Sequence, residues 1–325
     1  MPLLWALAVS APQCVCCLFQ KKTQEEMSRA VTRPRRTCTG LNASTEPLQP
    51  LCREAAFRPR GTQRMLPSGV KRMLPTLFVI GSMKTGTTSL WAQLVDNTQG
   101  HVLSGSLTDK GDVSRKEKDF FGDPTMWRRG HSWYARIWPT CPATSAAQIG
   151  VDATPAYHVW HDAPHNMATF YGAPSLAHVR LVWMLRDPIA KFWSYFWDLK
   201  AYGGEWDRVA FASWTEPKLA RTRECLKLNP ASPLWPPSLP PPFQNCAPHL
   251  DHGLYEPQLR RWLQFFRPSQ MLLVSFAGYV RRPAAVVKDV LLHASLPASV
   301  ASYAAAKARS SNSKANAGSG LQPES

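Results

Sequence analysis

Lysine, glycine and threonine residues gather in a short loop that follows an apolar run. The run Leu77–Ile80 is typical of a buried strand, and Thr87–Val95 has the pattern of a helix. Backbone N–H groups at a helix start point outward, and the helix dipole favours an anion there. Gly86 allows a tight turn and the close approach of a phosphate to the backbone. The pattern predicts a P-loop-like anion-binding loop whose contacts are Lys84, Thr85, Gly86, Thr87 and Thr88.

This loop differs from the common nucleotide-binding loop. That loop follows GxxxxGK(S/T), and here Gly81 and Gly86 fit, whereas Thr87 stands where the lysine belongs. The sequence also has no obvious acidic strand end for magnesium. A nucleotide-dependent kinase is therefore kept only as an alternative function. The alternative interpretation of the segment 77–95 is a strand, turn and helix that serve only the structure and bind no anion.

A second basic position follows a strong apolar run. Val179–Leu185 reads as a central parallel strand, and Arg186 comes directly after it. Asp187 and Pro188 then begin a helix as its N-cap and first residue. Because ligands of doubly wound sheets bind at the carboxyl ends of the strands, Arg186 is placed to hold a phosphate bidentately. The alternative interpretation is a structural salt bridge, to Asp187 or Asp198.

A carboxylate suited to proton transfer lies in a dense charge run. Glu117 stands between two lysines in "DVSRKEKDFF". Neighbouring positive charges favour the ionised form of a carboxyl group, and an ionised carboxylate within hydrogen-bond reach of a nucleophile can accept its proton. The alternative interpretation of this run is a solvated turn.

The elements that must position these residues alternate between strands and helices. Besides those already named, the expected strands are Ile149–Ala153 and Met271–Phe276, and the expected helices are Leu254–Phe266 and Ala284–His293. Such alternation is typical of an α/β fold with a doubly wound parallel sheet and helices on both faces.

Length and charge restrict the class of protein. The chain has 325 residues, 44% of them hydrophobic, and a net charge of +16. The first 75 residues hold 12 Lys and Arg against 4 Asp and Glu, so half of the basic excess lies in this segment. The remaining body is moderately basic, which suits an anionic ligand or acidic polymer. Basic residues are not interleaved with aromatic ones in a stripe, which argues against nucleic acid. A non-enzymatic polyanion binder is a further alternative.

Composition changes along the chain predict four segments. Residues 1–19 are mostly apolar but include Pro2, Pro12 and Gln13, so they are marginal for a spanning helix; they are kept as a signal peptide or a membrane anchor. Residues 20–75 are polar and basic without periodicity, which predicts a disordered stem or linker. Residues 76–296 form the expected domain, and 297–325 a low-complexity tail rich in alanine and serine.

The chain contains eight cysteines. No CxxC pair recurs, which disfavours a zinc ribbon, and no cluster of metal-ligand type is evident. Cys225 and Cys246 bracket the proline-rich segment Pro230–Pro242 and would close it by a disulfide in an oxidising compartment; two unpaired thiols are the alternative. The sequon at Asn42 predicts a glycoprotein.

Four stretches together resemble one family, the sulfotransferases that use 3′-phosphoadenosine-5′-phosphosulfate (PAPS). "KTGTTSL" resembles their 5′-phosphosulfate loop. "VWMLRDPIAKFWSYFW" resembles their 3′-phosphate site, in which a serine follows the arginine by eight residues; here these are Arg186 and Ser194. "KEKDFF" and "GLYEPQLRRWLQFFRPSQMLLVSF" resemble the Golgi carbohydrate branch, especially heparan sulfate N- and 3-O-sulfotransferases. The resemblance covers residues 76–296, with the motifs in family order.

The resemblance implies an activity and roles for these residues. It implies sulfuryl transfer from PAPS, the co-substrate, to a hydroxyl or amine of a glycan. The expected acceptor is a polysaccharide, and no metal is expected. It makes Glu117 the base, and it makes Lys84 the cation that neutralises the negative charge building on the leaving phosphate oxygen. It also implies a Golgi lumen or membrane location. If Glu117 is not the base, Asp152 and His158 are the next residues to test.

The chain departs from the branch at two places. In "VDATPAY", Ala153 stands where relatives often have a lysine near the acceptor, so heparan recognition does not carry over and a non-glycan acceptor is an alternative. The Lys-Gly loop that closes over the nucleotide is not evident near the C-terminus, where Lys314 is the one candidate contact.

Overall fold

The computed structural model describes residues 13–14, 51–54, 71–105, 116–142, 147–201, 210–228 and 251–318. Within these ranges no helix combines the length and the apolar character that crossing a bilayer requires.

A six-stranded sheet forms the centre of the molecule. Its spatial order is β1 (Gln13–Cys14), β8 (Met271–Ser275), β7 (Arg180–Leu185), β4 (Pro75–Gly81), β6 (Ile149–Asp152) and β5 (Val102–Ser104). The five strands from β8 to β5 are parallel, and β1 pairs antiparallel with β8. The predicted parallel sheet is confirmed.

The central strand β4 is buried along its whole length. Side chains of a strand alternate between the two faces of a sheet, and here Phe78 and Ile80 enter one core while Leu77 and Val79 enter the other. A strand covered on both faces reads as a continuous apolar run, which is why β4 and β7 were predictable from sequence.

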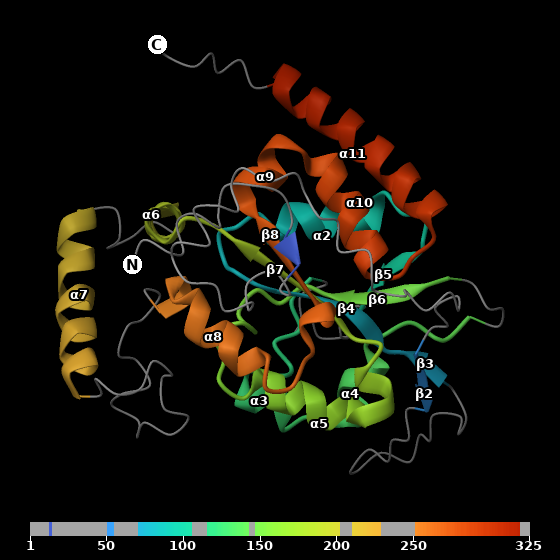
Figure 1. Ribbon diagram of the computed structural model, residues 1–325, viewed down its shortest axis with the longest axis horizontal. Helices are drawn as coiled ribbons and strands as arrows, with labels where there is room; N and C mark the ends of the chain where they lie inside the picture. Colours follow the sequence, from blue (N-terminus) through green and yellow to red (C-terminus); the bar gives the residue numbers. More distant parts are fainter. Residues whose placement is uncertain are drawn as a thin grey trace, which may run out of the picture.

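Helices cover both faces of the sheet (Figure 1). One core lies against α4 (His131–Arg136), α5 (Ala163–Leu176) and α8 (Tyr255–Trp262). The other lies against α2 (Thr87–Asp96), α10 (Pro283–His293) and α11 (Ala298–Gly318). The doubly wound α/β architecture is therefore confirmed.

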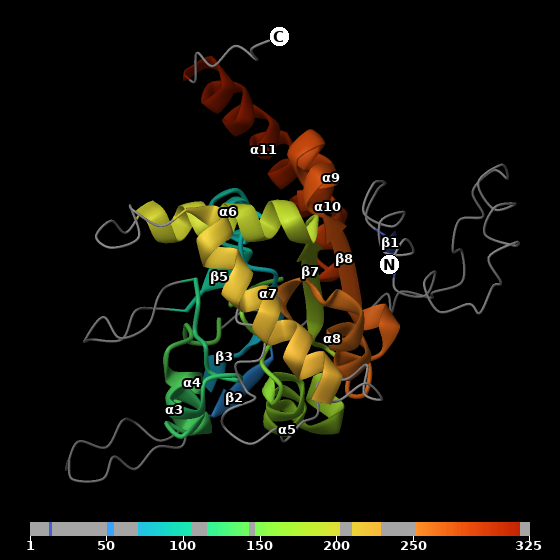
Figure 2. The same cartoon turned by 90° about the vertical axis from the view of Figure 1, so that its left-hand side faces the viewer.

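The other helices are short or lie outside these layers. They are α3 (Pro124–Trp127), α6 (Pro188–Ala201), α7 (Phe211–Leu228), α9 (Phe276–Arg281) and the 3-10 helices η4 (Asp251–Gly253) and η5 (Pro268–Gln270). In Figure 2, α6 and α7 lie on the side that faces the viewer, with the sheet behind them.

The strand order reverses direction at β4. From β4 the chain passes through α2 to β5 and β6 on one side of β4, and it then passes through α5 to β7 and β8 on the other side. In open α/β sheets, ligands bind outside the carboxyl ends of the strands at such a switch point. The topology therefore predicts a ligand-binding site at the carboxyl ends of β4 and β7.

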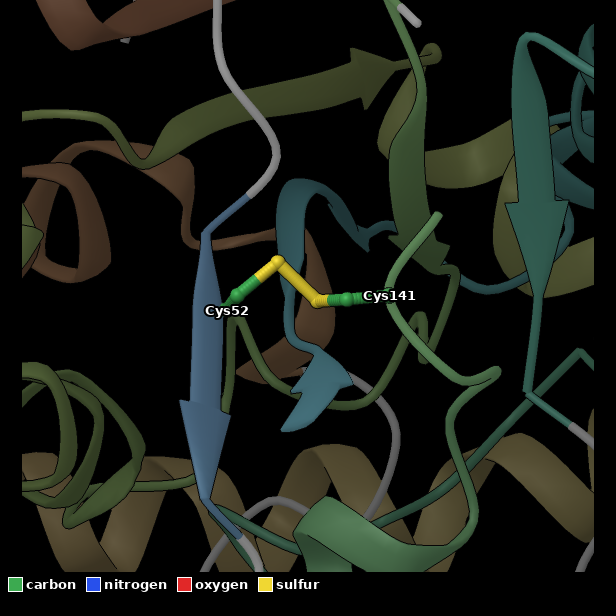
Figure 3. Close-up of a disulfide and its surroundings, with 2 residues drawn as sticks. All are labelled: Cys52 and Cys141. Atoms are coloured by element: carbon green, nitrogen blue, oxygen red, sulfur yellow. A yellow bond between two sulfur atoms is a disulfide. The ribbon is translucent and has the colours of Figure 1, made fainter. Parts of the chain in front are cut away.

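Residues predicted as linker form regular structure that is joined to the domain. β2 (Cys52–Glu54) pairs antiparallel with β3 (Lys71–Met73), and the amide of Met73 donates to the carbonyl of Pro139 at 2.9 Å. A disulfide joins Cys52 to Cys141, with 6.1 Å between the Cα atoms (Figure 3). For residues 51–54 and 71–73 the prediction of a disordered linker is wrong, because strands of three residues show no periodicity in the sequence.

The C-terminal segment also departs from the prediction. The residues from Ala298 that were expected to form a low-complexity tail form α11, which packs on α10. In the part of α11 whose side chains are described, 298–308, the buried ones are Ala301, Ala304, Ala305 and Ala308. Alanine is the strongest helix former, and its small side chain lets two helices approach closely. The limits 76–296 remain a prediction, and regular structure extends beyond them on both sides.

Three predictions fall wholly or partly outside the described residues. Cys246 and Asn42 lie there, so the Cys225–Cys246 disulfide and the glycosylated sequon stay predictions. The apolar segment 1–19 is described only at β1, so the signal peptide or anchor also stays a prediction.

Removal of the observed disulfide is expected to destabilise the protein. Cys52→Ser should lower the free energy of unfolding by about 2–4 kcal/mol, because the bond restricts a long loop in the unfolded chain. The measurement is denaturant unfolding without reductant. Cys141→Ser is the matched variant, and the double variant should lose no more than either single one, since both remove the same bond. Additive losses would show that the cysteines do not act as a pair.

Candidate active site

The loop between β4 and α2 has the geometry of an anion site. Gly86 precedes α2 with φ of 80°, and no side chain caps this helix N-terminus. A Cβ at Gly86 would lie 3.3 Å from the Phe276 ring, so both the backbone conformation and the close packing favour glycine. The first amides of α2 therefore face the loop, where an anion can accept their hydrogen bonds.

Threonines hold the loop and line its start. The hydroxyl of Thr85 is buried and donates to the carbonyl of Ser82 at 2.6 Å, which closes the turn from within. Thr87 is buried at the first position of α2, whereas Thr88 is exposed. Thr85 therefore shapes the loop by an internal bond, while the two following threonines lie where the amides of α2 begin.

Lys84 is paired with a residue far away in the sequence. Its ammonium lies 2.7 Å from the Asp198 carboxylate on α6, and both side chains are partly exposed. Exposed ion pairs of this kind contribute little to stability. Asp198 therefore occupies Lys84 at little energetic cost, and a ligand phosphate can replace it.

Arg186 follows β7 and reaches across to the same loop. Its guanidinium donates to the carbonyl of Lys84 at 2.9 Å and lies 4.5 Å from the centre of the Phe276 ring. Asp187 instead caps α6, accepting from the amide of Ala190 at 2.7 Å, as predicted. Asp198 pairs with Lys84. The two acidic residues considered as structural partners of Arg186 are thus engaged elsewhere.

Ser194 lies on α6 one turn before Asp198. Residues four apart share a helix face, so the half-buried Ser194 is on the face that presents Asp198 to Lys84. The structure thus brings Lys84, Arg186 and the Ser194 face of α6 to one end of the sheet.

Tyr255, which the sequence reading did not single out, connects the two parts of this region. Its hydroxyl donates to the carbonyl of Arg186 at 2.8 Å and lies near the Ser82 side chain at the start of the loop. Burial raises the pKa of Tyr255 to about 12, so the hydroxyl stays protonated at physiological pH. Tyr255 belongs to the "GLYEP" stretch, which supported the family resemblance but did not predict this contact.

Glu117 is held near the end of β6. The carbonyl of Lys116 accepts from the amide of Ala153 at 3.1 Å, and the amide of Lys118 donates to the Thr154 hydroxyl at 2.8 Å. The Glu117 carboxylate is partly exposed and lies 2.5 Å from the Lys116 ammonium. β4 lies between β6 and β7 in the sheet. The Glu117 segment lies at the end of β6, Lys84 comes after β4 and Arg186 comes after β7, so all three lie along the same edge of the sheet.

Asp119 is a second carboxyl group in the Glu117 segment, and the sequence reading missed it. Burial raises its pKa to about 7, with smaller contributions from Asp152 and Glu117. Its backbone has φ of 57°, and its amide donates to the Thr154 hydroxyl at 3.2 Å. A group that is partly protonated at neutral pH therefore lies beside the expected base.

Asp152 is fully buried within the domain. It accepts from the hydroxyls of Tyr134 at 2.7 Å, Thr154 at 2.7 Å and Tyr157 at 2.9 Å. Burial raises its pKa. These contacts favour a structural role for Asp152 over a role as the catalytic base.

His158 packs against Gly81, where the loop between β4 and α2 begins. Its Nδ1 lies 2.7 Å from the Pro155 carbonyl, and burial lowers its pKa to about 3. A Cβ at Gly81 would lie 2.5 Å from this ring, so glycine is needed there. The position of His158 therefore favours packing over proton transfer. Within the described ranges, no group of three or more His, Cys, Asp or Glu side chains is placed to hold a metal ion.

Known proteins similar to this chain are sulfotransferases. No family model matches. The human bifunctional heparan sulfate N-deacetylase/N-sulfotransferase 3 is 25% identical over 217 residues, which is 67% of this chain and 22% of that protein. The Caenorhabditis elegans N-deacetylase/N-sulfotransferase 1 is 24% identical over 70% of this chain and 23% of its own length. The chain thus spans less than a quarter of these relatives.

Two solved structures that match this chain at low similarity are named sulfotransferases. A sulfotransferase from Alicyclobacillus acidocaldarius matches with a TM-score of 0.49 and 20% identity over 69% of this chain and 82% of that one. The sulfotransferase domain of the curacin biosynthetic pathway has a TM-score of 0.37 and 12% identity over 70% and 75% of the two chains. The predicted resemblance to sulfotransferases is confirmed by the sequence relatives.

Proposed function

We propose that this protein transfers the sulfuryl group of PAPS to a hydroxyl or amine of a glycan. The observation that carries the proposal is the bond from Arg186 to the Lys84 carbonyl, because it places two cationic side chains from adjacent strand ends around one anion-binding loop. PAPS carries phosphate groups at both ends of its ribose and needs two such anion sites. The names of the sequence relatives support the donor and the type of acceptor.

In this proposal the two anion sites divide the donor between them. The 5′-phosphosulfate lies on the loop, with contacts from Lys84, Thr85, Gly86, Thr87 and Thr88. The 3′-phosphate lies against Arg186 and Ser194. Lys84 exchanges its partner Asp198 for the donor, since an ion pair this exposed is easily replaced.

The reaction proceeds by in-line attack on sulfur. The acceptor oxygen or nitrogen forms the new bond to sulfur as the bond from sulfur to the phosphate oxygen breaks. Glu117 takes the acceptor proton, Lys84 neutralises the charge on the departing phosphate oxygen, and 3′-phosphoadenosine-5′-phosphate (PAP) leaves. Positioning and charge stabilisation do most of the catalysis, as in phosphoryl transfer, and the proposal requires no metal.

The acceptor is proposed as a polysaccharide modified in the Golgi lumen. The moderately basic domain suits an acidic polymer, and the Cys52–Cys141 disulfide supports an oxidising compartment. Ala153 is buried directly after β6, at the position where the resemblance places a lysine near the acceptor in heparan sulfate enzymes. The proposal therefore names a polysaccharide and does not specify heparan sulfate. Membrane anchoring through residues 1–19 belongs to the same proposal.

Donor binding is tested by thermal unfolding of the full chain with PAP. PAP should raise the melting temperature, because a ligand bound only by the folded state stabilises it. Arg186→Ala should abolish most of this shift, while Arg281→Ala, a matched change at an exposed arginine of α9, should keep it. A shift of equal size with AMP would contradict the 3′-phosphate site.

The acceptor is identified by incubation with labelled PAPS and a panel of glycans, followed by disaccharide analysis of the products. Magnesium-dependent turnover of ATP would instead favour the kinase. Salt-sensitive binding to polyanions without any affinity for PAP would favour the non-enzymatic alternative.

A further inference from the structure

Tyr255 touches both halves of the proposed donor site through one oxygen atom. The hydroxyl donates to the Arg186 carbonyl at 2.8 Å, and the Arg186 amide approaches the same oxygen at 3.4 Å. The hydroxyl also lies near the Ser82 side chain, at the start of the loop. Ser82 in turn accepts from the indole N–H of Trp183 on β7 at 3.1 Å.

These contacts form a closed circuit around Arg186. Its main chain is hydrogen-bonded to Tyr255, and its side chain donates to the Lys84 carbonyl of the loop. The Tyr255 ring packs against Trp183, and the Trp183 indole donates to Ser82 at the start of the same loop. The direction of Arg186 and the shape of the loop are therefore set together. A shift of either anion site changes the other through the same hydroxyl.

The hydroxyl is the part of Tyr255 that matters for this coupling. The residue is 8% exposed and its ring packs in the core beside Trp183. Phenylalanine would fill the same space but would leave the Arg186 carbonyl without this donor. A buried polar group that loses its partner destabilises the arrangement that depended on it.

We propose that Tyr255 is a positioning residue that couples the loop for the 5′-phosphosulfate to the arginine for the 3′-phosphate. The inference rests on the proposed function and adds a residue to it. A ligand that fills both anion sites gains from the coupling, whereas a ligand that fills only the loop does not. Tyr255 therefore sets the preference for PAP over AMP.

Calorimetric titration of the full chain with PAP and with AMP tests this coupling. Tyr255→Phe should weaken PAP binding by about 10-fold, the range for one lost hydrogen bond in a buried network, and change AMP binding by less than about two-fold. Tyr171→Phe is the matched control, because this buried hydroxyl also donates to a carbonyl, that of Pro75 at 2.5 Å, at the opposite end of β4. Its preference for PAP should equal that of the wild type.

The outcomes separate the coupling from the function on which it rests. If the wild type prefers PAP and Tyr255→Phe keeps the same preference, or loses PAP and AMP equally, the coupling is overturned and the proposed function stands. If the wild type binds PAP no better than AMP, both are overturned. If Tyr255→Phe does not fold, Ser82→Ala removes the loop side of the same contact and should reproduce the loss of preference.

Discussion

Glu117→Gln is expected to lower turnover by about 100-fold or more, the usual range for the loss of a general base. Glutamine keeps the shape of the side chain but does not accept the acceptor's proton. PAP affinity should change little, because the Glu117 segment is held at the end of β6 whereas the donor contacts follow β4 and β7. Steady-state sulfation and PAP titration measure the two effects separately.

The control for this variant is Glu256→Gln. Glu256 is a glutamate of α8 that pairs with Arg260 one turn away, so its change removes a similar charge outside the proposed site. It should keep normal turnover. Near-normal turnover in Glu117→Gln itself would reduce Glu117 to part of a charged turn, and Asp119 would become the next carboxyl to test, ahead of the buried Asp152 and His158.

Lys84→Ala is expected to damage both donor binding and turnover. Loss of a charge-assisted bond to a phosphate should weaken PAP affinity by about 10- to 100-fold. Turnover should fall further, because the leaving oxygen loses the cation that stabilises it. Calorimetry with PAP and sulfation at saturating donor measure these effects.

The matched control for this variant is Lys288→Ala, at an exposed lysine of α10, which should alter neither quantity. Lys84→Ala and Glu117→Gln should thus look alike in a sulfation assay and differ in a donor-binding assay. Wild-type PAP affinity in Lys84→Ala would remove Lys84 from the donor site and leave only its pairing with Asp198.

The central elements of the fold were predictable because their signals are local. β4 and β7 are covered on both faces, so each is a continuous apolar run. The start of α6 was readable because an aspartate before a proline is a strong helix start, and Asp187 does cap the helix. The position of Lys84 and Gly86 between a strand and a helix was also predictable, because the apolar run of β4 and the helical pattern of α2 lie directly on either side of them.

The partners of these residues were not predictable because they are far apart in the chain. Asp198 lies 114 residues after Lys84, and Cys141 lies 89 residues after Cys52. The contact of Tyr255 with Arg186 spans 69 residues and depends on how α8 packs against the end of β7. Short elements such as β5 gave too few residues for any period to show. The roles of the site residues remain predictions.

The alanine contact between α10 and α11 has a consequence for shortened forms of the chain. Val286, Val287 and Val290 belong to the core that α11 helps to cover. A chain truncated after residue 297 keeps every described strand of the sheet but lacks this cover. It therefore presents an apolar surface to other chains and to chaperones, as partly folded chains commonly do. Truncation before Ala308, which is fully buried, removes part of this cover and leaves the valines of α10 more exposed.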